Sequence, residues 1–281
     1  MSKVVTNRKM TVLDLRRMKA ENRRITMLTA YDYTMARLVD AAGIDIVLVG
    51  DSLGMVIQGQ DNTLPVTLDH MIYHTRCVSR GLERAQLVMD MPFMTYHTQE
   101  EALRNAGRAL SEGRAEAVKM EGGEDLAETI HAVTRQGIPV MGHIGLTPQS
   151  VHALGGFKVQ GRKAERAEQI RRDAVAVEQA GAYSVVLEGI PMQLATEISQ
   201  MLTIPTIGIG AGNGCDGQVL VVNDLLGMDE GFKPKFVKRY ANLHQTIVSA
   251  IRTYAEEVRQ GVFPDEAHSF HFTTRRKREV A

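Results

Sequence analysis

The stretch Ile46-Val-Leu-Val-Gly-Asp51 is a short apolar run that ends at a carboxylate, and its pattern recurs along the chain. Apolar runs of this length, bounded by turn residues, are typical of parallel strands that are buried on both faces. Four more runs end in the same way, at Asp90, Glu121, His143 and Glu188. An ionisable side chain at the end of a buried strand is costly to leave unpaired. Five such residues at the same end of their strands therefore indicate one shared site.

Segments with helical periodicity separate nearly all of the apolar runs, so strands and helices alternate. This alternation predicts a parallel sheet with right-handed crossovers. Eight strands in 281 residues favour a closed α/β barrel, the (β/α)8 or TIM barrel, over an open doubly wound sheet. The carboxyl ends of all strands in such a barrel converge on one rim, where its enzymes carry their chemistry. The expected strands are 25–30, 45–49, 85–89, 117–120, 139–141, 184–187, 206–209 and 219–222.

The expected helices begin with a short one at 11–19, in which Thr11 is the N-cap and Asp14 completes a capping box. We expect this helix to cover the floor of the barrel. The link between the last two strands is short and rich in glycine, so one helix of the ideal pattern is missing there. We expect one domain over residues 1–281, with a polar arm at about 1–9 and a basic tail at about 271–281. The other expected helices are 33–42, 68–80, 99–111, 124–136, 163–180, 192–201 and 235 to about 259; loops are expected at 51–65 and 145–161.

The composition excludes several classes of protein. The chain has 33 basic and 33 acidic residues, and this balance argues against a nucleic-acid partner. The basic cluster Arg275-Arg276-Lys277-Arg278 is expected to be a solvated tail rather than an RNA or membrane anchor. Two cysteines, Cys77 and Cys215, form no disulfide framework or zinc spacing. With no apolar stretch of membrane-spanning length and no signal peptide, we expect a cytoplasmic protein without a membrane partner.

Asp51, Asp90 and Glu121 are the candidate metal ligands. Residues i and i+2 of a strand share a face, so we expect Asp51 to follow Val47 and Val49 on the inward face if that strand extends far enough. Carboxylate oxygens are the ligands that Mg²⁺ prefers, commonly one or two of them with several waters. Glu121 could bind the metal directly or through water. The alternative is that each carboxylate caps a helix or pairs with an arginine, and the sequence does not choose Mg²⁺ over Mn²⁺.

Three other residues at strand ends are candidates for binding and proton transfer. Lys119 lies two residues before Glu121, so it either pairs with that acid or holds a substrate carboxylate. His143 is either a core histidine or a proton relay. Glu188 suits a general base.

Seven segments of the chain resemble the ketopantoate hydroxymethyltransferase family, in the family's order and from about residue 9 to 265. They are LTAYDY (28–33), VGDSLGM (49–55), DMPFM (90–94), VKMEGG (118–123), MGHIGLTPQS (141–150), LEGIP (187–191) and IGIGAGNGCDGQVLVVNDLLG (207–227).

The resemblance implies a barrel of the phosphoenolpyruvate mutase/isocitrate lyase superfamily in a cytoplasmic homodecamer. It implies transfer of a hydroxymethyl group from 5,10-methylenetetrahydrofolate to 3-methyl-2-oxobutanoate through a Mg²⁺-stabilised enolate. The product is ketopantoate, a precursor in pantothenate and coenzyme A synthesis. One Mg²⁺ per subunit would be held by Asp51, Asp90 and Glu121. Substrate contacts would come from Asp51, Ser52, Asp90, Lys119, His143 and Tyr31, and the catalytic base would be Glu188.

Rival functions stay open on the residues alone. A C–C lyase or mutase would share the barrel, the metal and the enolate, but no cysteine in a suitable loop could serve as its acid. A retaining glycosidase would also show paired carboxylates, yet the chain has no tryptophan for a sugar platform. A barrel without activity, serving as a binding module, is disfavoured by the intact acid set. The segment Gly212–Gly217 matches G-x-G-x-x-G but precedes a strand, so it is no dinucleotide fingerprint.

Overall fold

The computed structural model describes residues 8–231 and 234–272. The described residues fall into two compact units, 8–222 with 234–237, and 223–231 with 238–272. The expectation of one domain over residues 1–281 stays a prediction. The basic cluster at 275–278 and most of the polar arm lie outside the described residues. Among the helices of the described ranges, none has the length and apolar character needed to cross a membrane.

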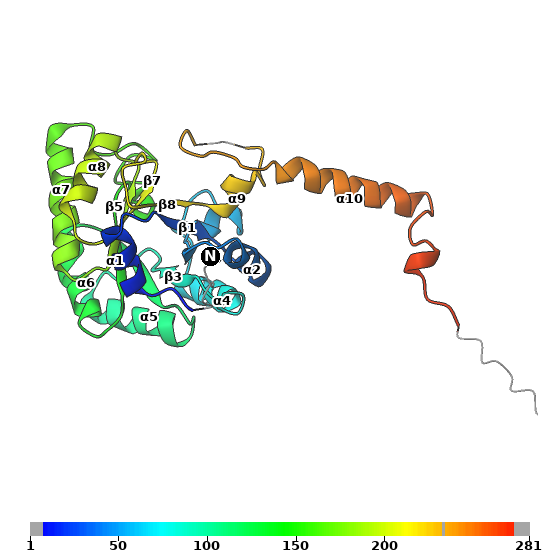
Figure 1. Ribbon diagram of the computed structural model, residues 1–281, viewed down its shortest axis with the longest axis horizontal. Helices are drawn as coiled ribbons and strands as arrows, with labels where there is room; N and C mark the ends of the chain where they lie inside the picture. Colours follow the sequence, from blue (N-terminus) through cyan, green and yellow to red (C-terminus); the bar gives the residue numbers. More distant parts are fainter. Residues whose placement is uncertain (1–7, 232–233, 273–281) are drawn as a thin grey trace, which may run out of the picture. The chain divides into compact units, whose positions relative to one another are not determined.

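The first unit is a closed barrel of eight parallel strands in sequential order, as predicted (Figure 1). Each strand pairs with its neighbours in the chain, and the first pairs with the last from Ile25↔Gly217 to Leu28↔Leu220. Closure leaves no free sheet edge. The strands are β1 (Ile25–Thr29), β2 (Ile46–Val49), β3 (Gln86–Asp90), β4 (Ala117–Glu121), β5 (Val140–Gly145), β6 (Ser184–Glu188), β7 (Thr206–Ile209) and β8 (Gly217–Leu220).

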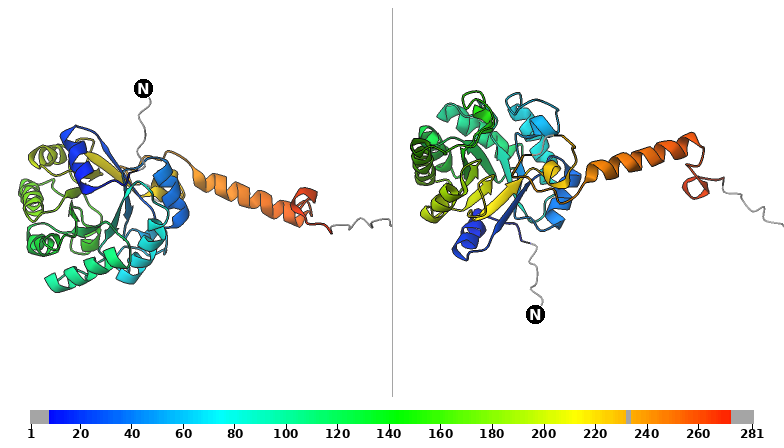
Figure 2. Two further views of the ribbon diagram at one scale, coloured as in Figure 1. Left: turned by 60° about the horizontal axis from the view of Figure 1, so that its bottom comes forward. Right: turned by 90° about the horizontal axis from the view of Figure 1, so that it is seen from above.

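Helices between the strands lie outside the barrel (Figures 1 and 2). As expected, no helix separates β7 from β8. In the second unit the ring of Phe263 packs edge-on against Tyr254 of the last helix, with centroids 5.7 Å apart. The helices are α1 (Val12–Ala20), α2 (Tyr33–Ala41), α3 (Leu53–Val56), α4 (Leu68–Ser79), α5 (Gln99–Ser111), α6 (Ala127–Thr134), α7 (Ala164–Gln179), α8 (Met192–Met201), α9 (Val222–Leu226) and α10 (Leu243–Arg259), with 3-10 turns at Glu124–Leu126, Pro148–Ser150 and Glu266–His268.

The floor of the barrel is closed by α1, as the sequence predicted. Leu15 and Met18 of this helix are buried in one apolar cluster with Ile25 of β1 and with Tyr183, which directly precedes β6. The helix begins with the expected capping box, in which Thr11 accepts from the backbone of Asp14 and Asp14 accepts from Thr11. The opposite end of the barrel is therefore the end available for a site.

Two strand predictions differ from the structure by two or more residues at an end. The predicted strand 139–141 continues as β5 to Gly145, because Gly142 marks a close approach and not a turn: a Cβ there would lie 2.4 Å from Cγ1 of Val177 on α7. The predicted strand 219–222 begins two residues earlier, at Gly217. A Cβ at Gly217 would lie 2.5 Å from the carbonyl oxygen of Ile25, so glycine permits the closing strand pair.

Three helix predictions also need correction. The expected loop 51–65 contains the short helix α3, and the expected helix 124–136 is divided into a 3-10 turn and α6. The expected helix from residue 235 begins only at Leu243. Backbone groups before it are used in other contacts, since Tyr240 N–H donates to the carbonyl of Leu225.

Candidate active site

The five predicted polar residues meet at the carboxyl ends of the strands. Asp90, Glu121 and Glu188 are the last residues of β3, β4 and β6, and His143 lies within β5. Parallel pairing sets Glu121 beside His143. Asp51 follows β2 after a turn at Gly50 and is 4% exposed. The sequence pattern therefore predicted this cluster correctly.

The path by which Asp51 reaches the cluster differs from the prediction. The inward-facing residues of β2 are Ile46 and Leu48, which belong to the apolar interior cluster, and not Val47 and Val49. The strand ends at Val49, so the alternation of faces stops before Asp51. The backbone N–H of Asp51 donates to Oδ2 of Asp90 at 3.0 Å, which fixes the turn against the neighbouring strand.

Lys119 connects the acids of two strands and is 4% exposed. Its Nζ lies 2.9 Å from Oδ1 of Asp90 and 3.9 Å from Oε1 of Glu121. Nδ1 of His143 is also 2.9 Å from Nζ. Burial alone would lower the pKa of Lys119, but the carboxylates of Asp90, Glu121 and Asp51 raise it above its usual value, so the ammonium stays charged.

His143 lies between two carboxylates. Its Nδ1 is 3.2 Å from Oε1 of Glu121, and its Nε2 is 3.1 Å from Oε2 of Glu188. Burial and the Lys119 cation lower the pKa of His143, but Glu121 and Glu188 outweigh them and raise it to about 9. The two ring nitrogens of the imidazole thus link Glu188 to the buried cluster. Glu188 has the more open position, with 16% of its side chain exposed.

The carboxylates differ in their electrostatic surroundings. Burial raises the pKa of Asp51 well above its ordinary value, and repulsion from Asp90 and Glu121 adds to this effect. Burial also raises the pKa of Asp90, although Lys119 opposes the shift. For Glu121 burial acts in the same direction, but His143 and Lys119 lower the pKa below its usual value. Asp51 is thus the acid that most lacks a compensating cation.

Tyr31 and Ser52, two of the candidates for substrate contacts, lie together. Tyr31 follows β1 and is 2% exposed, and its hydroxyl is 2.9 Å from Oγ of Ser52. Ser52 directly follows Asp51, so this pair borders the acidic cluster on the side of β1 and β2.

Sequence reasoning missed Gln149 and Tyr96. Gln149 lies in the 3-10 turn after β5, and its Nε2 donates to Oδ2 of Asp51 at 2.8 Å. Its backbone N–H donates to Oε2 of Glu121 at 3.0 Å. The hydroxyl of Tyr96 donates to Oε1 of Gln149 at 2.6 Å. Neither residue ends a strand, so periodicity carried no signal for either one.

The donor set fits a hard divalent cation. The three buried carboxylates of Asp51, Asp90 and Glu121 face the ammonium of Lys119, which leaves negative charge uncompensated. Within residues 8–231 and 234–272 no three His, Cys, Asp or Glu side chains form a ready-made metal cluster. Mg²⁺ does not require one, because it commonly takes one or two carboxylates and completes its shell with water and substrate oxygens.

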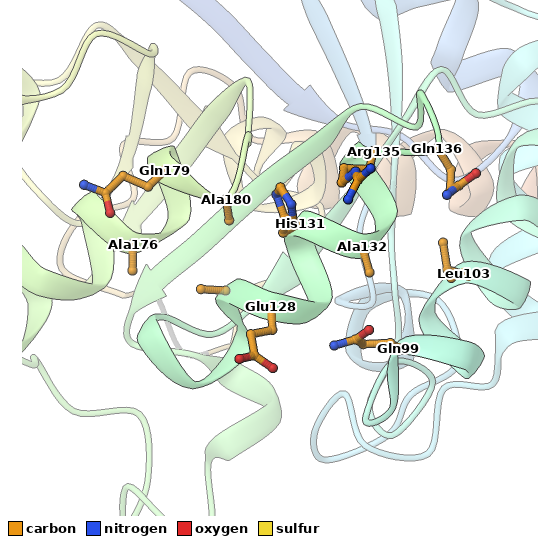
Figure 3. A pocket seen from close by; sticks show the side chains of 11 residues that line it. Gln99, Leu103, Glu128, His131, Ala132, Arg135, Gln136, Ala176, Gln179 and Ala180 are labelled. Carbon is orange, nitrogen blue, oxygen red and sulfur yellow. The ribbon is translucent and has the colours of Figure 1, made fainter.

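Two cavities are lined in part by residues of α7. One of about 730 Å³ lies on the outer surface between α5, α6 and α7, lined by Leu103, His131 and Gln179 among others, and by none of the predicted residues (Figure 3). A second, polar cavity of about 470 Å³ is lined by Gly122 and Gly145, and by Gln169 of α7. None of the predicted site residues lines this second cavity either, although Gly122 directly follows Glu121 in the chain.

Solved structures with the same fold define the class of barrel. A phosphonopyruvate hydrolase, crystallised with oxalate and Mg²⁺, matches with a TM-score of 0.59 and 14% identity over 92% of this chain and 93% of its own. A 2,3-dimethylmalate lyase of the PEP mutase/isocitrate lyase superfamily matches with a TM-score of 0.57 and 17% identity over 92% and 91%. The chain thus has the (β/α)8 barrel fold that it shares with these structures, as predicted.

Closer relatives are found by sequence. The family model described as "Ketopantoate hydroxymethyltransferase" matches residues 9–266. The 3-methyl-2-oxobutanoate hydroxymethyltransferase of Pelobacter propionicus is 61% identical over 265 residues, which are 94% of this chain and 98% of that protein. The enzyme of the same name from Trichlorobacter lovleyi is 60% identical over 94% and 99%. The chain belongs to the ketopantoate hydroxymethyltransferase family and is an enzyme of the transferase class.

Proposed function

We propose that the chain transfers a hydroxymethyl group from 5,10-methylenetetrahydrofolate to 3-methyl-2-oxobutanoate and so forms ketopantoate for pantothenate synthesis. The proposal rests on the buried carboxylates at the strand ends. Lys119 lies among them, and His143 connects them to the carboxylate of Glu188. The names of the relatives support the same substrate and product. The oxalate and Mg²⁺ in the phosphonopyruvate hydrolase structure support a small 2-oxo acid and a metal as ligands of this type of barrel.

Asp51, Asp90 and Glu121 would hold Mg²⁺, with Asp51 and Asp90 as the direct ligands and Glu121 direct or through water. When bound, the metal would act as a Lewis acid on the keto oxygen and lower the barrier to loss of the C3 proton. Lys119 would hold the substrate carboxylate with its ammonium group. Ser52 and Asp90 would also contact the keto acid, and Asp51 would hold it through the metal. Tyr31 and His143 would support these contacts.

Glu188 would be the base that removes the C3 proton. Its contact with Nε2 of His143 fixes the carboxylate, while its partial exposure leaves one side open to substrate. The C3 carbon of the resulting enolate bonds to the methylene carbon of the folate. The two C–N bonds between that carbon and the folate nitrogens break, and water supplies the hydroxyl group. The proton taken from C3 and the second proton of the water go to the two nitrogens, so tetrahydrofolate leaves and atoms and charge balance.

We further propose a cytoplasmic homodecamer that binds one Mg²⁺ per subunit and has no nucleic-acid or membrane partner. These statements rest on the family resemblance and on the neutral charge balance of the chain.

The test is to incubate the purified protein with 3-methyl-2-oxobutanoate, 5,10-methylenetetrahydrofolate and Mg²⁺, and to follow products by NMR. We expect ketopantoate to form, and to stop forming when EDTA removes the metal or when the folate is omitted. Cleavage of the keto acid without transfer would favour the lyase alternative. Absence of any reaction in folded, metal-loaded protein would favour a barrel without activity.

A further inference from the structure

Gln149 and Tyr96 form a hydrogen-bonded chain through the acidic cluster. The backbone N–H of Glu121 donates to the Tyr96 hydroxyl at 3.3 Å, and this hydroxyl donates to Oε1 of Gln149. Nε2 of Gln149 then donates to Oδ2 of Asp51 and, at 2.9 Å, to the carbonyl of Met91. Gln149 is 6% exposed and Tyr96 is 7% exposed, so water does not replace these contacts freely.

The groups at the two ends of this row of hydrogen bonds fix which atom donates at each step. The Asp51 carboxylate and the Met91 carbonyl can only accept, so the amide nitrogen of Gln149 must face them and its oxygen must face Tyr96. Burial raises the pKa of Tyr96 well above its usual value, and the nearby carboxylates add to this shift. The phenol therefore stays protonated and remains a donor to Gln149.

We propose that Gln149 is a positioning residue, which orients the carboxylates of Asp51 and Glu121 for metal binding, and that Tyr96 sets the orientation of the Gln149 amide. Two independent contacts carry this role, since the side chain of Gln149 binds Asp51 and its backbone binds Glu121. The inference rests on the proposed function in one respect, namely that these carboxylates hold a divalent cation. Hydrogen-bond partners of metal ligands typically change metal affinity by about 10–100-fold when they are removed.

The barrel contains a matched control. Tyr183 donates to Oε1 of Gln86 at 3.1 Å, and both residues are buried. Tyr183 belongs to the apolar cluster that contains α1 at the floor of the barrel. This second tyrosine–glutamine pair has similar chemistry but lies at the end of the strands opposite to the acids. Loss of a buried hydrogen bond can therefore be compared at the two ends of one barrel.

The experiment measures Mn²⁺ affinity from the EPR signal of free Mn²⁺, with thermal unfolding of each variant alongside. We expect Gln149→Met to weaken Mn²⁺ binding at least 10-fold, and Tyr96→Phe to weaken it less, because the amide loses only its orientation. The double variant should bind Mn²⁺ no more weakly than Gln149→Met, since Tyr96 acts through Gln149. Gln86→Met and Tyr183→Phe should lower the unfolding temperature but leave Mn²⁺ affinity unchanged.

The outcomes separate this inference from the proposed function. Failure of wild-type protein to bind Mn²⁺ would overturn the metal site itself. Normal wild-type binding with unchanged affinity in folded Gln149→Met, or an equal loss of affinity in Gln86→Met, would overturn the positioning role. If Gln149→Met does not fold, Tyr96→Phe serves in its place, because it removes only one oxygen atom. An Mn²⁺ affinity of Tyr96→Phe equal to that of Tyr183→Phe would then overturn the positioning role.

Discussion

Most of what the sequence predicted about the active site came from single residues at the ends of strands. Asp90, Glu121 and Glu188 could be predicted as one cluster because burial makes a lone charge costly and parallel strands end at one rim. Gln149 and Tyr96 could not, because they lie in loops and their alignment with the acids depends on how those loops fold back. For Lys119 the sequence left open a pair with Glu121 and a contact with a substrate carboxylate. Its shorter ion-pair contact in the structure is with Asp90, which is its register neighbour on β3.

At the residue scale we predict that Lys119→Met destabilises the metal-free protein. Removing the ammonium leaves the carboxylates of Asp90 and Glu121 buried without their cation, and such losses cost about 3–5 kcal/mol. Added Mg²⁺ should restore part of this loss, because it neutralises the same carboxylates. Urea unfolding in EDTA and in Mg²⁺ measures both effects. An unchanged unfolding midpoint in EDTA, or no gain with Mg²⁺, would contradict this electrostatic account.

At the scale of elements, caps and periodicity predicted most helices well, whereas glycines misled the prediction of strand ends. The predicted strand 139–141 ended before Gly142, although Gly142 lies within β5 and is the point at which α7 packs against that strand. Sequence pattern does not distinguish a glycine in a turn from one that permits close packing, because both need only the absence of a Cβ. The late start of α10 was missed because contacts before Leu243 override helix propensity.

The capping box of α1 gives a prediction for this element. Thr11→Ala removes the hydroxyl that binds Asp14, so it should lower the free energy of unfolding by about 1 kcal/mol at neutral pH. The hydrogen bond from Thr11 lowers the pKa of Asp14 below 3.8, so its stabilisation is full above that pH and is lost as pH falls through the lowered value. The difference between variant and wild type in urea unfolding should therefore shrink toward pH 3. A difference that grows with acidity would refute this assignment.

At the scale of the whole barrel, closure between the last strands and the first could be predicted only in outline. The number of strands implied a closed sheet. The hydrogen bonds that stabilise the closure join residues that are distant in sequence. Asp216, just before β8, accepts from Lys19 of α1 at 2.8 Å and from the backbone N–H of Thr206 on β7, also at 2.8 Å. One carboxylate thus joins the floor helix to both closing strands.

We predict that Asp216→Ala lowers the free energy of unfolding by roughly 2 kcal/mol, because a charged hydrogen-bond acceptor is lost while its donors stay partly buried. The matched control is Asp69→Ala, whose ion pair with Arg108 is exposed and should contribute less than about 1 kcal/mol. Chemical denaturation of both variants tests the comparison. If both variants lose the same unfolding free energy, the hydrogen bonds of Asp216 do not stabilise the barrel as proposed.

The central claim is that Glu188 removes the C3 proton of a keto acid held by the metal and Lys119. NMR of 3-methyl-2-oxobutanoate in D₂O, without folate, measures this step as deuterium exchange at C3. We predict Mg²⁺-dependent exchange in the wild type and at least a 100-fold slower rate in Glu188→Gln, with keto acid and Mn²⁺ affinity retained. Wild-type exchange rates in a folded Glu188→Gln variant would contradict the account.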